Sequence, residues 1–263
     1  MHKKSITLVS LAILAILLVI TIGVAGCGAP KAATAQSAPG TLYILGTYGA
    51  LSRGNYDGTV TIADVKKQGD FALGNFSAID GELVGLNGKI YQIGPQGKLT
   101  EAQDTWTTPN VNVCTFKADK VITIDKAMSW KDLQDYLAGQ LPTANIFYAI
   151  KLTGSFDFLK ARTLTKLNKP YPATPYSTIT ANEPAFQFNK VDSTLAMTFS
   201  PAFTSELVYP GFHAHFVNSD LKNGGHVLDC QITGGKAEVE YLPNFSVSLP
   251  QNSVFYQEDF TAK

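Results

Sequence analysis

The chain has 263 residues, of which 45% are hydrophobic and 16% are charged, which is the composition of a folded protein with a sizeable core. Its 21 Lys and Arg residues balance 21 Asp and Glu residues, so the formal net charge is zero. This balance provides no electrostatic basis for binding nucleic acid or an acidic membrane surface, and we expect no nucleic-acid partner.

The N-terminus predicts that the protein is exported. A basic segment, MHKK, precedes the apolar run SITLVSLAILAILLVITIGVAG, which has the length of a signal peptide or a membrane-spanning helix. Small residues then surround Cys27 in VAGCG, which resembles a bacterial lipobox, where the cysteine is lipidated and becomes the new N-terminus. We therefore expect a lipoprotein-type signal peptide over residues 1–27, with a lipid on Cys27 that holds the protein at the outer face of the bacterial cell membrane. The alternative is a retained membrane anchor with an incidental cysteine.

The rest of the chain predicts mostly β-structure. Residues 28–40 are mainly small residues and Pro, which is typical of a flexible tether. Short runs rich in Val, Ile, Thr, Tyr and Phe then alternate with clusters of Gly, Asn, Asp and Pro. Helices are predicted at 62–68 and at 129–141, where Ser129 caps the helix start. Residues 41–263 are therefore expected to be α+β, with mixed, mostly antiparallel sheets in two subdomains and few helices.

Two loops and two cysteines add detail to this prediction. The Asn-Gly pair of LNGK at 86–89 predicts a tight hairpin, because both residues tolerate the positive φ angles of such a turn. The Pro-rich stretch NKPYPATPYS at 168–177 is the expected boundary between the subdomains. Cys114 and Cys230 each lie in a strand-like apolar run, and we expect two free thiols rather than the single disulfide that export permits.

Three of the four histidines lie within one stretch, GFHAHFVNSDLKNGGHVLD at 211–229. Residues two apart in a strand point to the same face, so His213 and His215 are expected to project together. The turn residues Asn-Gly-Gly then let a second strand fold back and bring His226 to that face. Three converging imidazoles with an open fourth position are typical of a catalytic zinc site, although the same ligands accept iron, copper or nickel.

Two further residues are candidates for the chemistry of this site. Glu82, in GNFSAIDGELVG, lies in a segment that otherwise has the pattern of a core strand, where a carboxyl group can act as a general acid or base. Arg162, in a later strand, can bind a substrate carboxylate through two hydrogen bonds. From the pattern alone, a solvent-exposed surface role is the simpler interpretation of both side chains. The residues thus predict a metal enzyme without defining its reaction.

Taken in order, four stretches resemble the α-acetolactate decarboxylase family. They are LYILGTYGALSRGNYDGTVTIADVKKQGDFALGNFSAIDGELVGLNGKIYQI, DTWTTPNVNVCTF, GSFDFLKARTLTKLNKPY and PGFHAHFVNSDLKNGGHVLD. The resemblance extends over nearly all of the chain that follows the tether. It implies a carboxy-lyase that converts 2-acetolactate to acetoin and carbon dioxide, on a mixed β-sheet fold of two subdomains that forms homodimers.

The resemblance also implies a role for each candidate residue. The family's zinc ligands fall on His213, His215 and His226, its active-site glutamate on Glu82 in the DGE motif, and its substrate-binding arginine on Arg162 in the K-x-R-[ST] motif. On this basis Zn²⁺ is the expected cofactor and stabilises the enediolate that forms as carbon dioxide leaves. Arg162 then holds the substrate carboxylate, and a nearby carboxylic acid delivers the proton.

The C-terminus departs from the family pattern and leaves two alternatives open. The family has a second active-site glutamate in a C-terminal tail, for which Glu258 is the nearest candidate and is expected to take part in catalysis. Without that group, the chain would be a non-catalytic exported zinc-binding lipoprotein. The other alternative is a cupin-like metal enzyme, which requires a carboxylate after three or four intervening residues beyond the His-x-His pair. Ser219 and Asp220 occupy these two positions.

Overall fold

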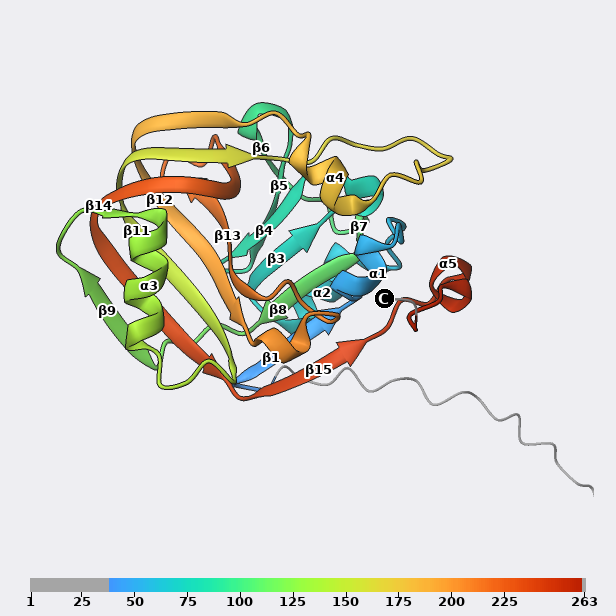
Figure 1. Ribbon diagram of the computed structural model, residues 1–263, viewed down its shortest axis with the longest axis horizontal. Helices are drawn as coiled ribbons and strands as arrows, with labels where there is room; N and C mark the ends of the chain where they lie inside the picture. The colour runs from blue at the N-terminus through green and yellow to red at the C-terminus, as the bar shows by residue number, and fades with distance from the viewer. Residues whose placement is uncertain (1–37, 262–263) are drawn as a thin grey trace, which may run out of the picture. The chain divides into compact units, whose positions relative to one another are not determined.

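Two β-sheets pack against each other in the computed structural model, which describes residues 38–261 (Figure 1). The predicted signal peptide, Cys27 and most of the predicted tether lie outside these residues. One sheet consists, in spatial order, of β15 (Asn244–Ser248), β1 (Thr41–Leu45), β8 (Asn110–Cys114), β3 (Phe71–Asn75), β4 (Glu82–Leu86), β5 (Lys89–Ile93) and β6 (Leu99–Glu101). β1 and β15 run parallel, and the other neighbours in this sheet run antiparallel.

The second sheet is antiparallel throughout and contains the longest strands of the described chain. In spatial order it consists of β10 (Met128–Ser129), β14 (Gly224–Leu242), β11 (Phe147–Arg162), β12 (Phe186–Ser200) and β13 (Gly211–Asn218), and β9 (Lys120–Ile124) also pairs with β14. Because β13 pairs with β14 as well as with β12, the strands β11, β12, β13 and β14 close into a ring. This closure brings the end of β11 and the second half of β13 to the two sides of the start of β14.

Short helices and turns connect and cover these sheets. The helices are α1 (Tyr48–Ser52), α2 (Ile62–Gln68), α3 (Trp130–Gln140), α4 (Tyr176–Ala181) and α5 (Ser253–Gln257). Three 3₁₀ turns, η1 (Ser77–Ile79), η2 (Pro95–Gly97) and η3 (Ala202–Thr204), and a small strand pair, β2 (Val60–Thr61) with β7 (Thr107–Thr108), complete the described elements. Mostly antiparallel sheets with few helices confirm the predicted α+β class.

The two predicted helices form where expected. α2 covers the predicted range 62–68, and α3 starts directly after Ser129, whose side-chain oxygen accepts a hydrogen bond from the backbone N–H of Asp132. Leu133 and Leu137, one turn apart on α3, are buried against the second sheet, while α2 lies over the outer face of the first sheet. The apolar spacing of α3 is therefore that of a helix lying on a sheet.

The hairpin and the free thiols are also confirmed. Asn87 and Gly88 connect β4 to β5 with φ angles of 52° and 80°, the left-handed conformation that such a turn needs. Cys114 and Cys230 are both buried free thiols. Within residues 38–261, no helix is long and apolar enough to cross a membrane.

The Pro-rich segment 168–177 does not separate the two sheets. It connects β11 to β12, which pair with each other from Tyr148 and Phe199 to Ala161 and Phe186 within a single sheet. The chain instead passes from the first sheet to the second between β8 and β9 and returns after β14. The predicted boundary therefore does not coincide with either passage, because a Pro-rich connection can also join two neighbouring strands.

Candidate active site

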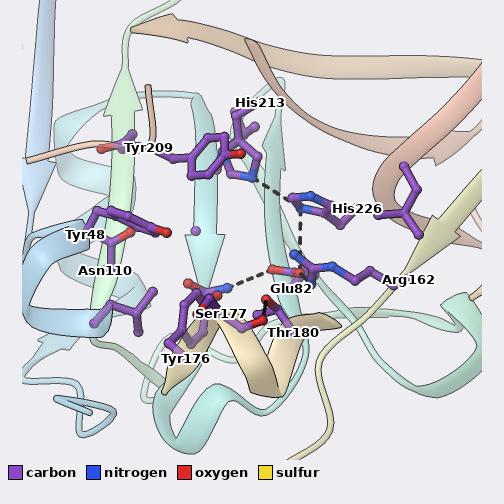
Figure 2. Close-up of a pocket in the computed structure, with 16 residues that line it drawn as sticks. Tyr48, Glu82, Asn110, Arg162, Tyr176, Ser177, Thr180, Tyr209, His213 and His226 are labelled. Carbon is purple, nitrogen blue, oxygen red and sulfur yellow. Dashed lines mark hydrogen bonds and ion pairs between the residues drawn. The ribbon is translucent and has the colours of Figure 1, made fainter. Parts of the chain in front are cut away.

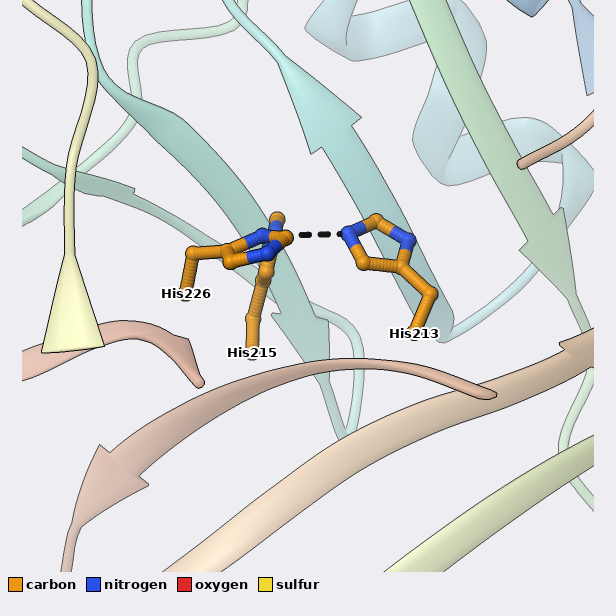
Figure 3. A group of neighbouring side chains, drawn as sticks. All are labelled: His213, His215 and His226. Carbon is orange, nitrogen blue, oxygen red and sulfur yellow. Dashed lines mark hydrogen bonds between the residues drawn. The ribbon is translucent and has the colours of Figure 1, made fainter. Parts of the chain in front are cut away.

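Three histidine side chains from two adjacent strands converge on one point (Figure 3). His213 and His215 are two residues apart on β13, and the register of the ring places His226 of β14 directly opposite His215. The Nε2 atoms of His213 and His215 lie 3.3 Å and 3.2 Å from Nδ1 of His226. The structure thus brings together the three residues that the sequence pattern predicted.

The spacing and chemistry of these nitrogens fit a metal ion. Four ligands arranged tetrahedrally at about 2.0–2.1 Å from zinc lie ~3.3 Å from one another, close to the two distances between the ring nitrogens. Burial lowers the pKa of His215 to about 4 and holds the pKa values of His213 and His226 well below their usual value. All three imidazoles are therefore neutral at pH 7, as metal ligands must be.

The ligand atom of His215 is fixed by a hydrogen bond on the other side of its ring. Its Nδ1 donates to the backbone carbonyl of Leu83 on β4 over 2.8 Å, which leaves the lone pair of Nε2 directed at the other two histidines. His213 has no equivalent support, because its buried Nδ1 has no hydrogen-bond partner among the described residues. The contact with Leu83 also places the site where β4 of the first sheet meets the second.

A buried carboxyl group lies beside the histidines. Glu82, at the start of β4, is only 1% exposed, and its Oε1 and Oε2 lie 3.8 Å from Nδ1 of His226 and 3.6 Å from Nε2 of His215. Oε2 accepts a hydrogen bond of 2.7 Å from Nδ2 of Asn75, and Oε1 accepts one of 2.9 Å from Nη1 of Arg162. Burial raises the pKa of Glu82 to about 7, although Arg162 and Asn75 oppose the shift. This group can therefore hold or release a proton near neutral pH.

The loop between β3 and β4 holds Glu82 in this position. Asn75 and Glu82 face each other across the two strands, and the loop that joins them is tightly wound. Ile79, a fully buried β-branched residue, adopts a φ of 46°, a conformation that such residues rarely take. Gly81 has a φ of 82°, and a Cβ atom there would lie 2.6 Å from the carbonyl oxygen of Ile93. The DGE motif thus needs its glycine to place the glutamate.

Arg162 completes a polar wall of the same cavity. It is the last residue of β11, and the register pairs it with His226 on β14. Its side chain is 12% exposed, so a surface role is excluded for Arg162 as it is for Glu82. The cavity has a volume of about 340 Å³. Figure 2 shows Glu82, Arg162, His213 and His226 around it.

Several lining residues were not anticipated from the sequence. Asn75, Tyr48, Tyr176 and Tyr209 all face the cavity, and the ring of Tyr209 lies 6.0 Å from that of His213. Tyr209 precedes the His-x-His pair by only four residues, so its proximity could have been inferred. Asn75 interrupts the apolar strand FALGN directly before the Glu82 loop, which is also a usable indication. Nothing in the sequence pattern distinguishes Tyr48 or Tyr176 from a core tyrosine.

The structure does not bring Glu258 into the cavity. Glu258 follows α5, its carboxylate lies 4.0 Å from Nε of Arg53 beside α1, and its side chain is 32% exposed. The expected catalytic role of Glu258 is therefore not supported by its position. Asp220 is likewise exposed in the turn after β13, where it accepts a hydrogen bond from the backbone N–H of Lys222, and Ser219 is exposed too. Neither supplies the carboxylate that a cupin-like site would need.

Comparison with known proteins decides the family. A family model described as alpha-acetolactate decarboxylase matches residues 42–262. The chain belongs to the alpha-acetolactate decarboxylase family. This membership confirms the resemblance predicted from the sequence, and with it the prediction that the protein is an enzyme of a carboxy-lyase family.

Individual relatives match this chain over most of their length. The alpha-acetolactate decarboxylase of Brevibacillus brevis is 34% identical over 88% of this chain and 81% of its own, and that of Methanosarcina mazei is 34% identical over 85% of this chain and 77% of its own. The crystal structure of the Bacillus subtilis alpha-acetolactate decarboxylase superposes with a TM-score of 0.80 at 30% identity, covering 83% of this chain and 93% of that one. The sheet arrangement described above is thus the fold of the family.

Proposed function

We propose that this protein decarboxylates 2-acetolactate to acetoin and carbon dioxide, using a zinc ion held by His213, His215 and His226. One observation carries the proposal: three neutral imidazoles converge at the wall of a single cavity, which His213 and His226 line together with a buried carboxyl group and a buried guanidinium. The substrate needs each of these groups. It carries adjacent hydroxyl and ketone oxygens, a carboxylate that leaves, and a carbon atom that must gain a proton.

Each residue type matches one step of this reaction. The Lewis acidity of a bound zinc ion stabilises the negative charge that develops on the substrate oxygens. Arg162 binds the substrate carboxylate and orients the bond that breaks. As carbon dioxide leaves, the electron pair of that bond stays on the former carboxyl-bearing carbon, and the protonated carboxyl group of Glu82 supplies the proton. Asn75 and Arg162 hold the resulting Glu82 carboxylate until solvent protonates it again.

Acetoin formation tests this proposal directly. The purified full-length chain is incubated with racemic 2-acetolactate, with and without a chelator, and acetoin is measured against the spontaneous rate. We expect acetoin above that rate, loss of formation with chelator, and recovery when zinc is added back. Adding iron, copper or nickel instead identifies which metal supports turnover. A folded, zinc-loaded protein that forms no acetoin above the spontaneous rate would reject the proposal.

Replacing Arg162 by alanine is expected to raise KM for 2-acetolactate about 10- to 100-fold, because a charge-assisted pair of hydrogen bonds to the carboxylate is lost. We expect kcat to change much less. Steady-state kinetics separates the two constants. Arg53→Ala is the matched control, since Arg53 pairs with Glu206 over 2.9 Å outside the cavity. A fall in kcat at unchanged KM would show that Arg162 does not hold the substrate carboxylate.

The cellular location and the oligomeric state of the enzyme form a second part of the proposal. The apolar run before VAGCG supports export and lipidation of Cys27, and hence attachment to the outer face of the bacterial cell membrane. Mass spectrometry of the N-terminal peptide tests the lipid. The family resemblance supports a homodimer, and light scattering of the detergent-solubilised chain measures its mass.

A further inference from the structure

A buried tyrosine from the connection between β11 and β12 lies in the wall of the cavity. Tyr176, the first residue of α4, is 7% exposed and lines the cavity together with Ser177 and Thr180 of the same helix. Thr180 donates its hydroxyl hydrogen to the carbonyl of Ser177. The hydroxyl of Tyr176 has no hydrogen-bond partner among residues 38–261, whereas Tyr148, which is 0% exposed, donates to the carbonyl of Thr143 over 2.7 Å. The Tyr176 oxygen is not one of the fully buried polar atoms without a partner, so the hydroxyl is accessible from the cavity that Tyr176 lines.

The phenol of Tyr176 faces the Glu82–Arg162 pair. Figure 2 places α4 on the side of the cavity next to these two residues, and Tyr209 on the other side with His213. Burial raises the pKa of Tyr176 far above its usual value, the Glu82 carboxylate adds to this shift, and Arg162 opposes it. The hydroxyl therefore stays protonated at neutral pH and is available only as a hydrogen-bond donor or neutral acceptor.

Packing fixes the direction of this side chain. The ring of Tyr176 lies edge-on to Tyr48 at 6.4 Å and against Tyr56 at 6.2 Å. It also belongs to a small apolar cluster with Leu51 and Leu164. A donor held in this way loses little conformational entropy when a ligand accepts its hydrogen bond, which is the requirement for a preorganised binding group.

We propose that Tyr176 is a further substrate-binding residue, whose hydroxyl donates a hydrogen bond to the carboxylate of the 2-hydroxy-3-keto acid beside Arg162. The inference rests on the proposed function. A metal ion held by the histidines would take the hydroxyl and ketone end of the substrate, and the carboxylate would then lie toward the cationic side of the cavity. Arg162 and Tyr176 are donors on that side, which Ser177 also lines, whereas the amide nitrogen of Asn75 is already bound to Glu82.

Two small probes separate this contact from the rest of the site. Acetoin is the substrate without its carboxylate, and 2-hydroxy-2-methylpropanoate keeps the carboxylate and hydroxyl but has a methyl group in place of the acetyl group. Calorimetric titration of the zinc-loaded full-length chain gives a dissociation constant for each. In Tyr176→Phe we expect binding of 2-hydroxy-2-methylpropanoate to weaken about 10-fold or more, while binding of acetoin stays within about twofold of the parent. KM for 2-acetolactate should rise by a similar factor, with a smaller change in kcat.

The control is Tyr56→Phe, which removes a buried hydroxyl from the same cluster outside the cavity and is expected to alter neither probe. Unchanged binding of the carboxylate probe to folded Tyr176→Phe, or equal weakening of both probes, would overturn the inference. Failure of the proposed function is read separately, from the absence of acetoin formation by the parent protein. A parent that binds both probes but forms no acetoin would reject the reaction and still permit the test of Tyr176.

Discussion

Replacing His226 by alanine is expected to remove zinc and activity together. The Nδ1 of His226 lies within 3.3 Å of both other ligand nitrogens, so it completes the triangle that a metal ion would need. Loss of groups that merely support a ligand weakens metal binding about 10- to 100-fold, and loss of a ligand itself should exceed this. Without the Lewis acid, which is worth several kcal/mol in the transition state, kcat should fall by about 10³-fold or more.

Zinc content measured by inductively coupled plasma mass spectrometry, together with acetoin formation, checks this prediction. Asp229→Asn is the matched control: Asp229 is an exposed potential ligand on the same strand, but it does not belong to the histidine group. It should keep both zinc and activity. Full activity in metal-depleted His226→Ala protein would contradict the zinc assignment, and so would a variant that retains stoichiometric zinc but loses turnover.

The histidine group could be predicted because its geometry is local. Two residues of one strand, a glycine-containing turn and the first residues of the next strand are enough to bring His213, His215 and His226 together. The helix over 129–141 and the hairpin at 86–89 were predictable for the same reason, since a cap or a turn depends on a few consecutive residues. In each case the sequence pattern contains the interaction that forms the structure.

The rest of the site depends on contacts between distant segments. Glu82 and Arg162 become buried neighbours only because β4 packs against the ring of strands and β11 pairs with β14. Their residue patterns alone suggested surface side chains, and the family resemblance was needed to place them in the site. Tyr176 shows the limit most clearly, because it lies in a Pro-rich segment whose composition indicated a boundary rather than a cavity wall.

The position of Glu258 shows where prediction from the family resemblance fails. The resemblance implied an acidic residue from the C-terminus in the active site, but the chain after β15 packs α5 beside α1, where Arg53 is the nearest cation to Glu258. Within residues 38–261, the acid that faces the histidines is Glu82. In the proposed reaction Glu82 is therefore the acid that delivers the proton, and solvent has to protonate it again after each turnover.

Replacing Glu82 by glutamine is expected to lower kcat by about 10²- to 10⁴-fold while zinc stays bound, because general acid catalysis contributes that much. Glutamine has the same shape and can still accept the hydrogen bond from Arg162. The parent should be active below the pKa of Glu82, which is about 7, and should lose activity as pH rises through it. A bound zinc ion lowers the pKa of Glu82, so the loss of activity then begins at a lower pH but still occurs as pH rises. The residual activity of Glu82→Gln should not show this pH-dependent loss.

Stability provides a readout that does not depend on turnover. The pKa of Glu82 is raised from 4.5 to about 7 by burial, so between these pH values the metal-free parent should lose about 3 kcal/mol of unfolding free energy relative to Glu82→Gln. The three buried histidines, whose pKa values are lowered, contribute the opposite slope, and they do so in both proteins. Urea unfolding of both metal-free proteins from pH 4.5 to 8 measures the difference.

Replacing Glu258 by glutamine should leave kcat within about twofold, because the carboxylate of Glu258 faces Arg53. A loss at Glu258 as large as that at Glu82 would show that the C-terminal segment reaches the substrate during turnover, and Glu82 would then share proton delivery with it.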